Sequence, residues 1–182
     1  MVYSANLRCN LRYFVLQPEV AGGTGPKTVF IDRCARPPVM SHFNYQFDGW
    51  LGDPILETIG NIIVTEPIKD RLTRLKASGA SFAAVEVSKS SEFEDLYPGR
   101  ELPPFVWLQV YGHAGQDDFS YTSDHVLMVS ERILDVLRES GMSNCTIFRL
   151  EDWKGLQAAM LEKIQRFRLA NPLLRKGDGR GN

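Results

Sequence analysis

The apolar residues of this chain first recur with the short period of extended strands. Segments 11–16 and 27–33 are rich in aromatic and β-branched residues, and a Gly/Pro loop at 20–26 joins them, which predicts a hairpin. In segment 43–51 the aromatic residues alternate with polar ones, so an extended segment with one aromatic face is expected. Two more apolar runs, 105–111 and 126–129, predict further strands.

Two later segments have the longer period of helices and resemble each other. Ile68, Leu72 and Leu75 make an apolar stripe in the first, and Ile133 and Leu137 begin one in the second. Residues 64–72 and 129–137 share five of nine positions. Thr65 and Ser130 are suited to cap helices, because their hydroxyls can accept hydrogen bonds from first-turn amides. A Ser-Gly pair follows each helix at Gly79 and Gly141 and predicts its end. The following runs, 82–87 and 145–150, are strand-like.

These features predict two similar strand–helix–strand units. The units extend over residues 62–87 and 127–150. Two interpretations stay open: an internal duplication, or two unrelated amphipathic helices with ordinary caps.

A third helix is predicted at 153–169, and its apolar residues recur three and four positions apart. These residues are Trp153, Leu156, Met160, Ile164 and Phe167. Lys154, Lys163 and Arg166 lie off this stripe, which is therefore expected to pack on the core. The Asn-Pro pair at 171–172 ends the helix.

The pattern as a whole predicts an α+β fold, with a mixed or antiparallel sheet and about three helices packed on it. A single domain is expected over residues 1–170, with a flexible tail at 171–182. The chain shows no secretory signal and no apolar run of membrane-spanning length, so a cytoplasmic protein without membrane contact is expected. Its cysteines, Cys9, Cys34 and Cys145, are expected to be reduced thiols.

The net charge of the whole chain is close to zero, but the net charges of its segments differ strongly. The sequence has 21 Lys and Arg against 22 Asp and Glu, for a net charge of −1, which argues against a strongly basic nucleic-acid binder. Residues 1–81 carry a net +2, residues 82–131 carry −7, and residues 132–182 carry +4. The centre of the sequence is therefore strongly acidic.

Most of the central acids fall in stretches expected to be turns, 88–101 and 112–124. One interpretation is ordinary solvated loops. The other is a surface that attracts a basic partner, with aromatic anchors among the acids. The predicted contact residues are Glu92, Glu94, Asp95, Tyr97, Glu101, Asp117, Asp118 and Phe119.

Catalytic motifs are weak. Segment 21–28 has the Lys-Thr of a phosphate-binding loop, but Ala21 and Pro26 occupy its glycine positions, so a hairpin loop is favoured. The alternative to a binding protein is a small metal-dependent hydrolase that uses His113, Asp117, Asp118 and His125, whose spacing matches no standard metal motif. A regulatory or scaffold domain is a third class. We expect no catalytic residues, no bound metal and no cofactor.

A family resemblance adds a specific expectation. The run FDGWLGDPILE at 47–57, followed by IIVTE at 62–66, resembles bacterial immunity proteins of the Myxococcus-type immunity-domain group. The segments 103–108 and 129–131 are similar to the same family, so the resemblance covers about residues 43–150. Some relatives carry CxxCG pairs that this chain lacks, which excludes their zinc-bearing form.

The resemblance implies a cytoplasmic protein that binds and neutralises a toxin of a polymorphic or type VI secretion system. The expected partner is a cognate toxin protein with a basic surface, and neither nucleic acid nor a membrane. The resemblance does not identify that toxin.

Overall fold

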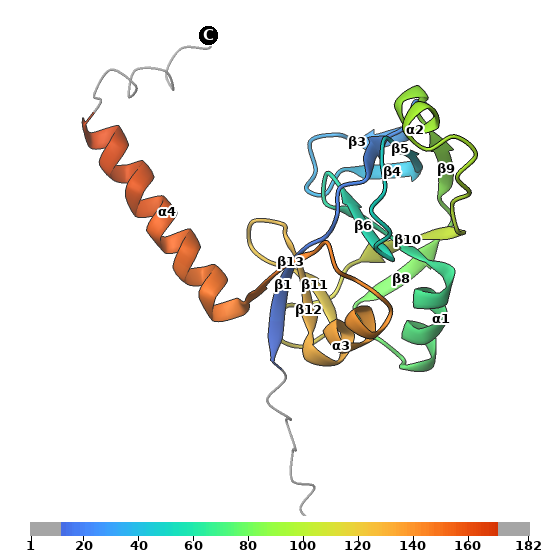
Figure 1. Cartoon of the computed structure of the whole chain (residues 1–182). Coiled ribbons are helices and arrows are strands. Elements are labelled where there is room, and N and C mark those ends of the chain that lie inside the picture. The colour runs from blue at the N-terminus through green and yellow to red at the C-terminus, as the bar shows by residue number, and fades with distance from the viewer. Residues whose placement is uncertain (1–11, 171–182) are drawn as a thin grey trace, which may run out of the picture. The chain divides into compact units, whose positions relative to one another are not determined.

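The strands divide among several sheets, and four helices accompany them. The computed structural model describes residues 12–170. These residues fall into two compact units, and the chain passes from the first to the second after Ile147. Mixed helices and antiparallel sheets confirm the α+β class (Figure 1). The predicted tail at 171–182 and Cys9 lie outside the described residues. The predicted single domain over 1–170 stays a prediction.

Two four-stranded sheets have equivalent spatial orders, and they differ in whether the third strand precedes or follows the other three in the chain. One sheet, in spatial order, contains β6 (Ile55–Thr58), β7 (Asn61–Thr65), β10 (Phe105–Val110) and β8 (Ala80–Ala83). The other contains β11 (Phe119–Tyr121), β12 (Leu127–Ser130), β1 (Tyr13–Gln17) and β13 (Thr146–Arg149). Each begins with a sequential hairpin, continues through a helix, and receives its third strand from elsewhere in the chain.

Two helices occupy equivalent places beside these two sheets. The first, α1 (Glu66–Arg74), connects β7 to β8, and the second, α3 (Glu131–Glu139), connects β12 to β13. Registers also match, since Thr65 lies opposite Phe105 and Ser130 lies opposite Tyr13.

Backbone hydrogen bonds repeat with this register. The N–H of Glu66 donates to the carbonyl of Pro104 at 3.0 Å, and that of Glu131 donates to Arg12 at 2.9 Å. This agreement in order, register and hydrogen bonding supports the interpretation of an internal duplication.

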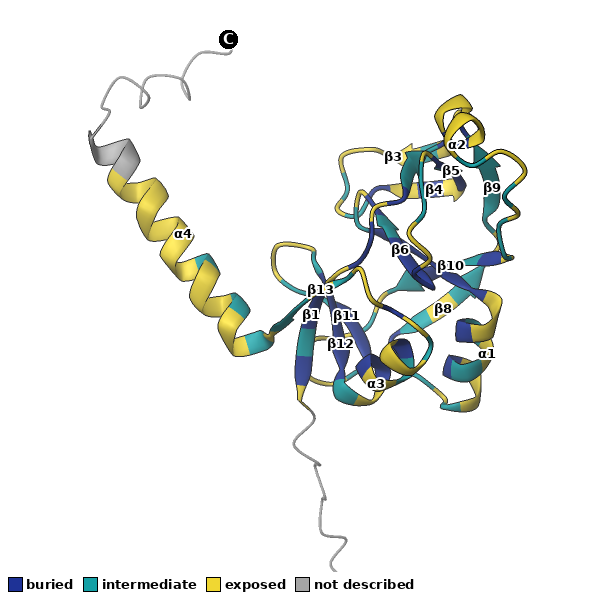
Figure 2. Ribbon diagram, viewed as in Figure 1, coloured by how far each residue is buried: buried dark blue, intermediate teal, exposed yellow. Residues whose placement is uncertain are grey.

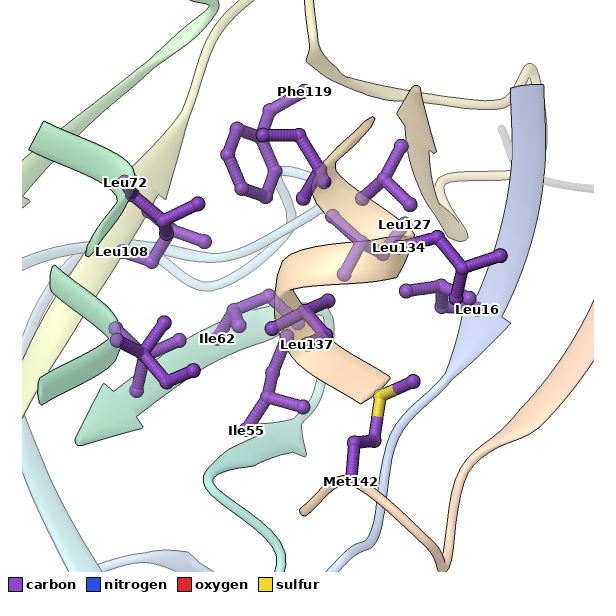
Figure 3. Packing of buried hydrophobic residues seen from close by; sticks show 14 residues of the cluster. Leu16, Ile55, Ile62, Leu72, Leu108, Phe119, Leu127, Leu134, Leu137 and Met142 are labelled. Carbon is purple, nitrogen blue, oxygen red and sulfur yellow. The ribbon is translucent and has the colours of Figure 1, made fainter. Parts of the chain in front are cut away.

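Within the first compact unit, the two four-stranded sheets share one hydrophobic core, in which α1 and α3 contact each other (Figure 3). The predicted stripes are confirmed, because Ile68, Leu72, Ile133 and Leu137 are all buried. Arg71 of α1 reaches across to the end of α3, where its guanidinium donates to the Ser140 hydroxyl at 2.6 Å and to the Val136 carbonyl at 3.3 Å.

The predicted hydroxyl caps are wrong in mechanism, although their positions are right. Thr65 and Ser130 are the N-cap residues, but neither side chain makes a capping hydrogen bond. The Ser130 hydroxyl instead donates to the buried carboxylate of Asp118 at 2.7 Å. A charged acceptor forms a stronger hydrogen bond than a first-turn amide offers, and tertiary contact therefore decides the orientation of this hydroxyl.

The predicted glycine stops hold for one helix only. Gly141 has a φ of 94° directly after α3, as expected. At α1 the left-handed residue is Lys76, with a φ of 53°, and the N–H of Ala77 closes the helix on the Leu72 carbonyl at 3.0 Å. Gly79 is required for a different reason, because a Cβ there would lie 2.3 Å from the Phe119 carbonyl oxygen.

The aromatic segment forms a second core. Its strand β5 (Asn44–Phe47) lies between β2 (Gly22–Thr24) and β9 (Glu86–Lys89), antiparallel to the first and parallel to the second. Phe43, Tyr45 and Phe47 are buried, which confirms the predicted aromatic face. The ring of Phe47 lies 4.9 Å from that of Tyr45 and 5.4 Å from that of Phe105, so this core also joins β5 to β10.

The predicted hairpin between segments 11–16 and 27–33 is wrong. β1 pairs with β12, and β3 (Val29–Asp32) pairs with β4 (Val39–His42). The intervening 21–28 segment is not a plain loop either, since it contains β2. β3 pairs with the next strand along the chain, whereas the partner of β1 lies more than a hundred residues later, where local spacing does not reveal it.

A short helix, α2 (Ser91–Leu96), occupies the stretch that was expected to be a turn. The Ser90 hydroxyl accepts from the N–H of Phe93 at 3.2 Å, and the Phe93 ring is buried in the second core. The Ser90 cap and the buried Phe93 side chain therefore hold α2 in place.

This contrast between caps is testable. Ser90→Ala is expected to lower the free energy of unfolding by about 1 kcal/mol, because it removes the acceptor of a first-turn amide. Thr65→Val keeps the shape of a side chain that makes no capping bond, and it should cost less. Chemical denaturation of both variants measures the difference; equal losses would contradict the assignment of the cap.

The second compact unit contains the last helix, α4 (Leu150–Ala170). Trp153 contacts Phe148, with ring centroids 5.1 Å apart. The expected packing of the stripe of Leu156, Met160 and Ile164 on the core stays a prediction. The side chain of Phe167 lies outside the described part.

Candidate binding surface

Three of the predicted contact residues lie together on α2. Glu92, Glu94 and Asp95 are exposed on a helix whose inner side is held by Phe93 (Figure 2). We call these three carboxylates the α2 acidic face. Glu101 is also exposed, shortly after the helix. The buried phenylalanine turns the acids outward, since it fixes which side of the helix meets the core.

One of these carboxylates, that of Glu94, forms an ion pair with a cation of its own chain. Glu94 lies 3.4 Å from the Lys89 ammonium, which also donates to the Arg100 carbonyl at 2.6 Å. Glu92 accepts from its own backbone N–H and from the Ser91 and Ser90 hydroxyls, and these hydrogen bonds lower the pKa of its carboxyl. These hydrogen bonds therefore favour the ionised form of Glu92.

Beside α2 is a groove of about 280 Å³ that we call the Trp50 groove. Its lining combines two aromatic rings with apolar and acidic side chains: Glu19, Val20, Ala21, Gly22, Asp48, Gly49, Trp50, Leu51 and Tyr97. Val20 and Leu51 are 70% and 69% exposed. Leu96 of α2, at 67%, adds a further exposed apolar side chain next to Tyr97. Exposed apolar groups bordered by carboxylates are typical of a protein interface.

The groove is held in shape by two charged residues. Arg100 lies over both aromatic rings, 4.9 Å from the centroid of Trp50 and 5.0 Å from that of Tyr97, and its guanidinium donates to the Trp50 carbonyl at 2.8 Å. On the other side the buried Glu19 carboxylate accepts from the N–H of Leu51 at 2.6 Å. These contacts fix Tyr97, at the end of α2, relative to the Trp50 loop.

The remaining predicted residues do not join this surface. Asp117, Asp118 and Phe119 lie at the start of β11 in the other sheet, away from α2 (Figure 1). Asp118 is 3% exposed and Phe119 is 1% exposed, so the expectation that they present a contact surface is wrong. Phe119 packs in the first core, as its position on the inward face of β11 requires.

Asp118 has a structural partner set instead. Its carboxylate forms an ion pair with Arg132 and accepts from the N–H of Ser78 at 2.8 Å and from the Ser130 hydroxyl. Burial raises the pKa of the Asp118 carboxyl, but the hydrogen bonds from Arg132, Ser78 and Ser130 outweigh it and leave the pKa below its ordinary 3.8. Asp118 therefore connects the start of β11 to the segment that follows α1 and to the start of α3.

The four residues of the alternative metal site do not converge. Among residues 12–170 no group of three or more His, Cys, Asp or Glu side chains is placed to hold a metal ion. His113 and Asp117 form a local pair, with 3.7 Å between Nδ1 and Oδ2, while Asp118 is occupied by Arg132. His125 lines a different cavity, of about 610 Å³, beside Arg33 and Arg36.

The sequence indicated the acids of α2 but not the groove beside them. Val20, Asp48, Trp50 and Leu51 come from two loops separated along the chain, and only the fold brings them beside Tyr97. One signal was present: Trp50 and Leu51 stand between Gly49 and Gly52, where a loop displays large side chains without a strand or helix to bury them.

Within residues 12–170, the structure contains no helix with the length and hydropathy needed to cross a bilayer. Comparison with known proteins finds no matching family model and no significantly similar curated protein.

Proposed function

We propose that this chain is an inhibitory binding protein that neutralises a basic partner by covering it. The observation that carries the proposal is the pairing of the α2 acidic face with the Trp50 groove. Carboxylates accelerate encounter with a positively charged protein, and exposed apolar side chains beside them supply the contact that retains it. The resemblance to bacterial immunity proteins makes a secreted bacterial toxin, acting in the cytoplasm, the expected partner.

Occlusion is the mechanism that suits these residues. A basic groove that binds an anionic substrate is complementary to Glu92, Glu94 and Asp95, so the bound inhibitor would occupy the place of that substrate. Aromatic side chains at the centre of an interface contribute most of its affinity, which assigns this role to Trp50 and Tyr97. The hydrolase alternative is not proposed, because its candidate ligands lie apart.

The experiment is growth rescue. The protein encoded next to this chain is expressed in a bacterial host, alone and together with the chain. The proposal expects arrested growth in the first case, rescue in the second, and a stable complex on purification. A neighbouring protein that is harmless, or that forms no complex, contradicts it.

The role of charge has its own test on that complex. Reversing Glu92, Glu94 and Asp95 to lysine is expected to slow association about tenfold or more at low salt, because the attraction that guides encounter becomes repulsion. The measurement is the association rate at several salt concentrations, where the variant should lose the salt dependence of the original chain.

Three exposed acids on α1 and α3 provide the matched control: Glu66, Asp70 and Asp135. Reversing these to lysine changes the net charge equally but leaves the α2 acidic face intact. Equal slowing in both triple variants would show that net charge alone acts, and would remove this face from the proposal.

A further inference from the structure

A cavity of about 610 Å³ lies where three connecting segments of the first compact unit meet. The β3–β4 hairpin, the turn between β6 and β7, and the loop between β11 and β12 supply most of its lining. We call it the Ile59 cavity. Its volume is in the range of sites that bind small molecules.

Close contacts around Gly60 hold these segments together. Gly60 has a φ of 81°, and a Cβ there would lie 3.2 Å from the Pro37 Cβ and 3.9 Å from the His125 carbonyl oxygen. The Tyr121 hydroxyl donates to the Gly60 carbonyl at 2.8 Å. The walls of the cavity are therefore fixed relative to one another by packing and by a hydrogen bond.

One of these walls contains a strained residue. Thr58 pairs directly with Asn61, so the loop between them has two residues. Both of these, Ile59 and Gly60, have a positive φ, of 46° and 81°. Such a loop favours Asn, Asp or Gly, and a β-branched side chain in it is an outlier. Because strain of this kind clusters at ligand sites, the 51% exposed side chain of Ile59 indicates a binding role.

Two arginines of the β3–β4 hairpin bring positive charge to the cavity. The Arg33 guanidinium lies over the Phe30 ring, 3.9 Å from its centroid. That of Arg36 donates to the carbonyls of residues 33–35, at 3.3, 3.3 and 3.1 Å. No ion pair within residues 12–170 includes either arginine. Neutral partners position both guanidinium groups and leave their charge for an anion, which this fork-shaped group binds well.

The acids of the lining do not neutralise these arginines by direct pairing. Asp124 accepts from the Thr122 hydroxyl at 2.7 Å. Glu57 is partly buried, and this burial raises the pKa of its carboxyl and so disfavours its charged form. A ligand therefore meets the guanidinium groups as its strongest charged partners in the cavity.

We propose that the Ile59 cavity binds a small molecule that carries a phosphate or carboxylate group on an apolar body. Arg33 and Arg36 hold the anionic group, while Ile59 and the neighbouring Pro37 and Pro38 contact the apolar body. This inference goes beyond the proposed function, because the cavity shares no lining residue with the Trp50 groove or the α2 acidic face.

Titration of the full chain with phenyl phosphate and with benzoate, followed by amide chemical shifts in NMR spectra, tests the site. At least one of these anions should shift the amides of Ile59, Gly60 and His125 with a Kd of about 1 mM or tighter, and the tighter one identifies the preferred group. Neutral benzyl alcohol should bind at least about tenfold more weakly. No shift with either anion, or equal binding of all three compounds, overturns the proposal.

The arginines have a matched control. The double change Arg33→Gln and Arg36→Gln should weaken binding of the preferred anion by at least about tenfold, because it removes the cationic partners. The double change Arg74→Gln and Arg138→Gln changes the net charge equally at exposed positions of α1 and α3, and it should leave the affinity unchanged. Equal losses in the two variants would overturn the assignment of the anion to this cavity.

Ile59→Asn separates binding from folding. Asn suits a two-residue loop with positive φ, so the variant should unfold at a higher denaturant concentration than the original chain. Its affinity for the preferred anion should nevertheless fall about tenfold, because an apolar contact is lost. A variant that is more stable and binds equally well would overturn the binding role of Ile59.

Discussion

Asp118→Ala is expected to lower the free energy of unfolding by about 3–5 kcal/mol, a large fraction of the stability of an ordinary domain. The substitution leaves the guanidinium of Arg132 without its partner and the part-buried N–H of Ser78 without an acceptor. It also removes the acceptor of the Ser130 hydroxyl. Because these donors come from both helical units, the loss loosens the shared core as well as β11.

The neighbouring carboxylate offers a control. Asp117 accepts from the N–H of His113 at 2.8 Å within an exposed loop, so Asp117→Ala should cost much less than Asp118→Ala. Equilibrium denaturation of the two variants compares them directly. Similar losses would show that the ion pair and hydrogen bonds of Asp118 contribute little beyond an exposed side chain.

The pH dependence of Asp118→Asn separates charge from shape. The pKa of the native Asp118 carboxyl lies below its ordinary 3.8, so its ionised form stabilises the fold above that pH and this contribution is lost as pH falls through the native pKa. The original chain should therefore be more stable than the variant at neutral pH, and the difference should shrink below about pH 4. A difference that is constant with pH would contradict this.

Asp53→Ala is the second substitution with a large expected effect, also about 3–5 kcal/mol. The Asp53 carboxylate is completely buried and accepts four hydrogen bonds from two consecutive residues. The backbone N–H groups of Ser143 and Asn144 donate at 2.9 and 2.8 Å, and their side chains donate at 3.1 and 2.9 Å. Without this acceptor, two part-buried backbone amides and two side chains lose their partner.

Asp53→Asn keeps one acceptor oxygen and should recover part of the loss, whereas Asp48→Ala, at an exposed position close by, should cost little. Thermal or chemical denaturation measures all three. An alanine variant as stable as Asp48→Ala would show that water replaces the carboxylate. Asp53 also belongs to the FDGWLGDPILE run, which therefore includes a residue whose contacts are structural.

Periodicity predicted the parts of the fold that depend on burial alone. Ile68, Leu72, Ile133 and Leu137 were assigned to inward faces because they recur at helical spacing, and the shared core buries each of them. The alternation of Phe43, Tyr45 and Phe47 gave the face of β5 for the same reason. Burial follows from the local pattern in these elements because each of them buries one side only.

Pairing and polar geometry could not be predicted in this way. The partner of β1 is β12, more than a hundred residues later, and no local signal identifies it. The Ser130 hydroxyl and Asp118 were interpreted separately, as a cap and a contact residue, but each satisfies the other. For the candidate surface, the acids were visible as a sequence cluster, while the Trp50 groove required two loops to meet.

The matching order of the two sheets has a consequence for how the chain folds. β10 follows its own unit within a short distance, but the equivalent strand of the other unit is β1, at the beginning of the described chain. During synthesis β1 is made before its two partner strands, so both of its edges stay unpaired until β12 and β13 have left the ribosome. The first sheet can therefore assemble while the chain is still growing, and closure of the second is the late, slow step.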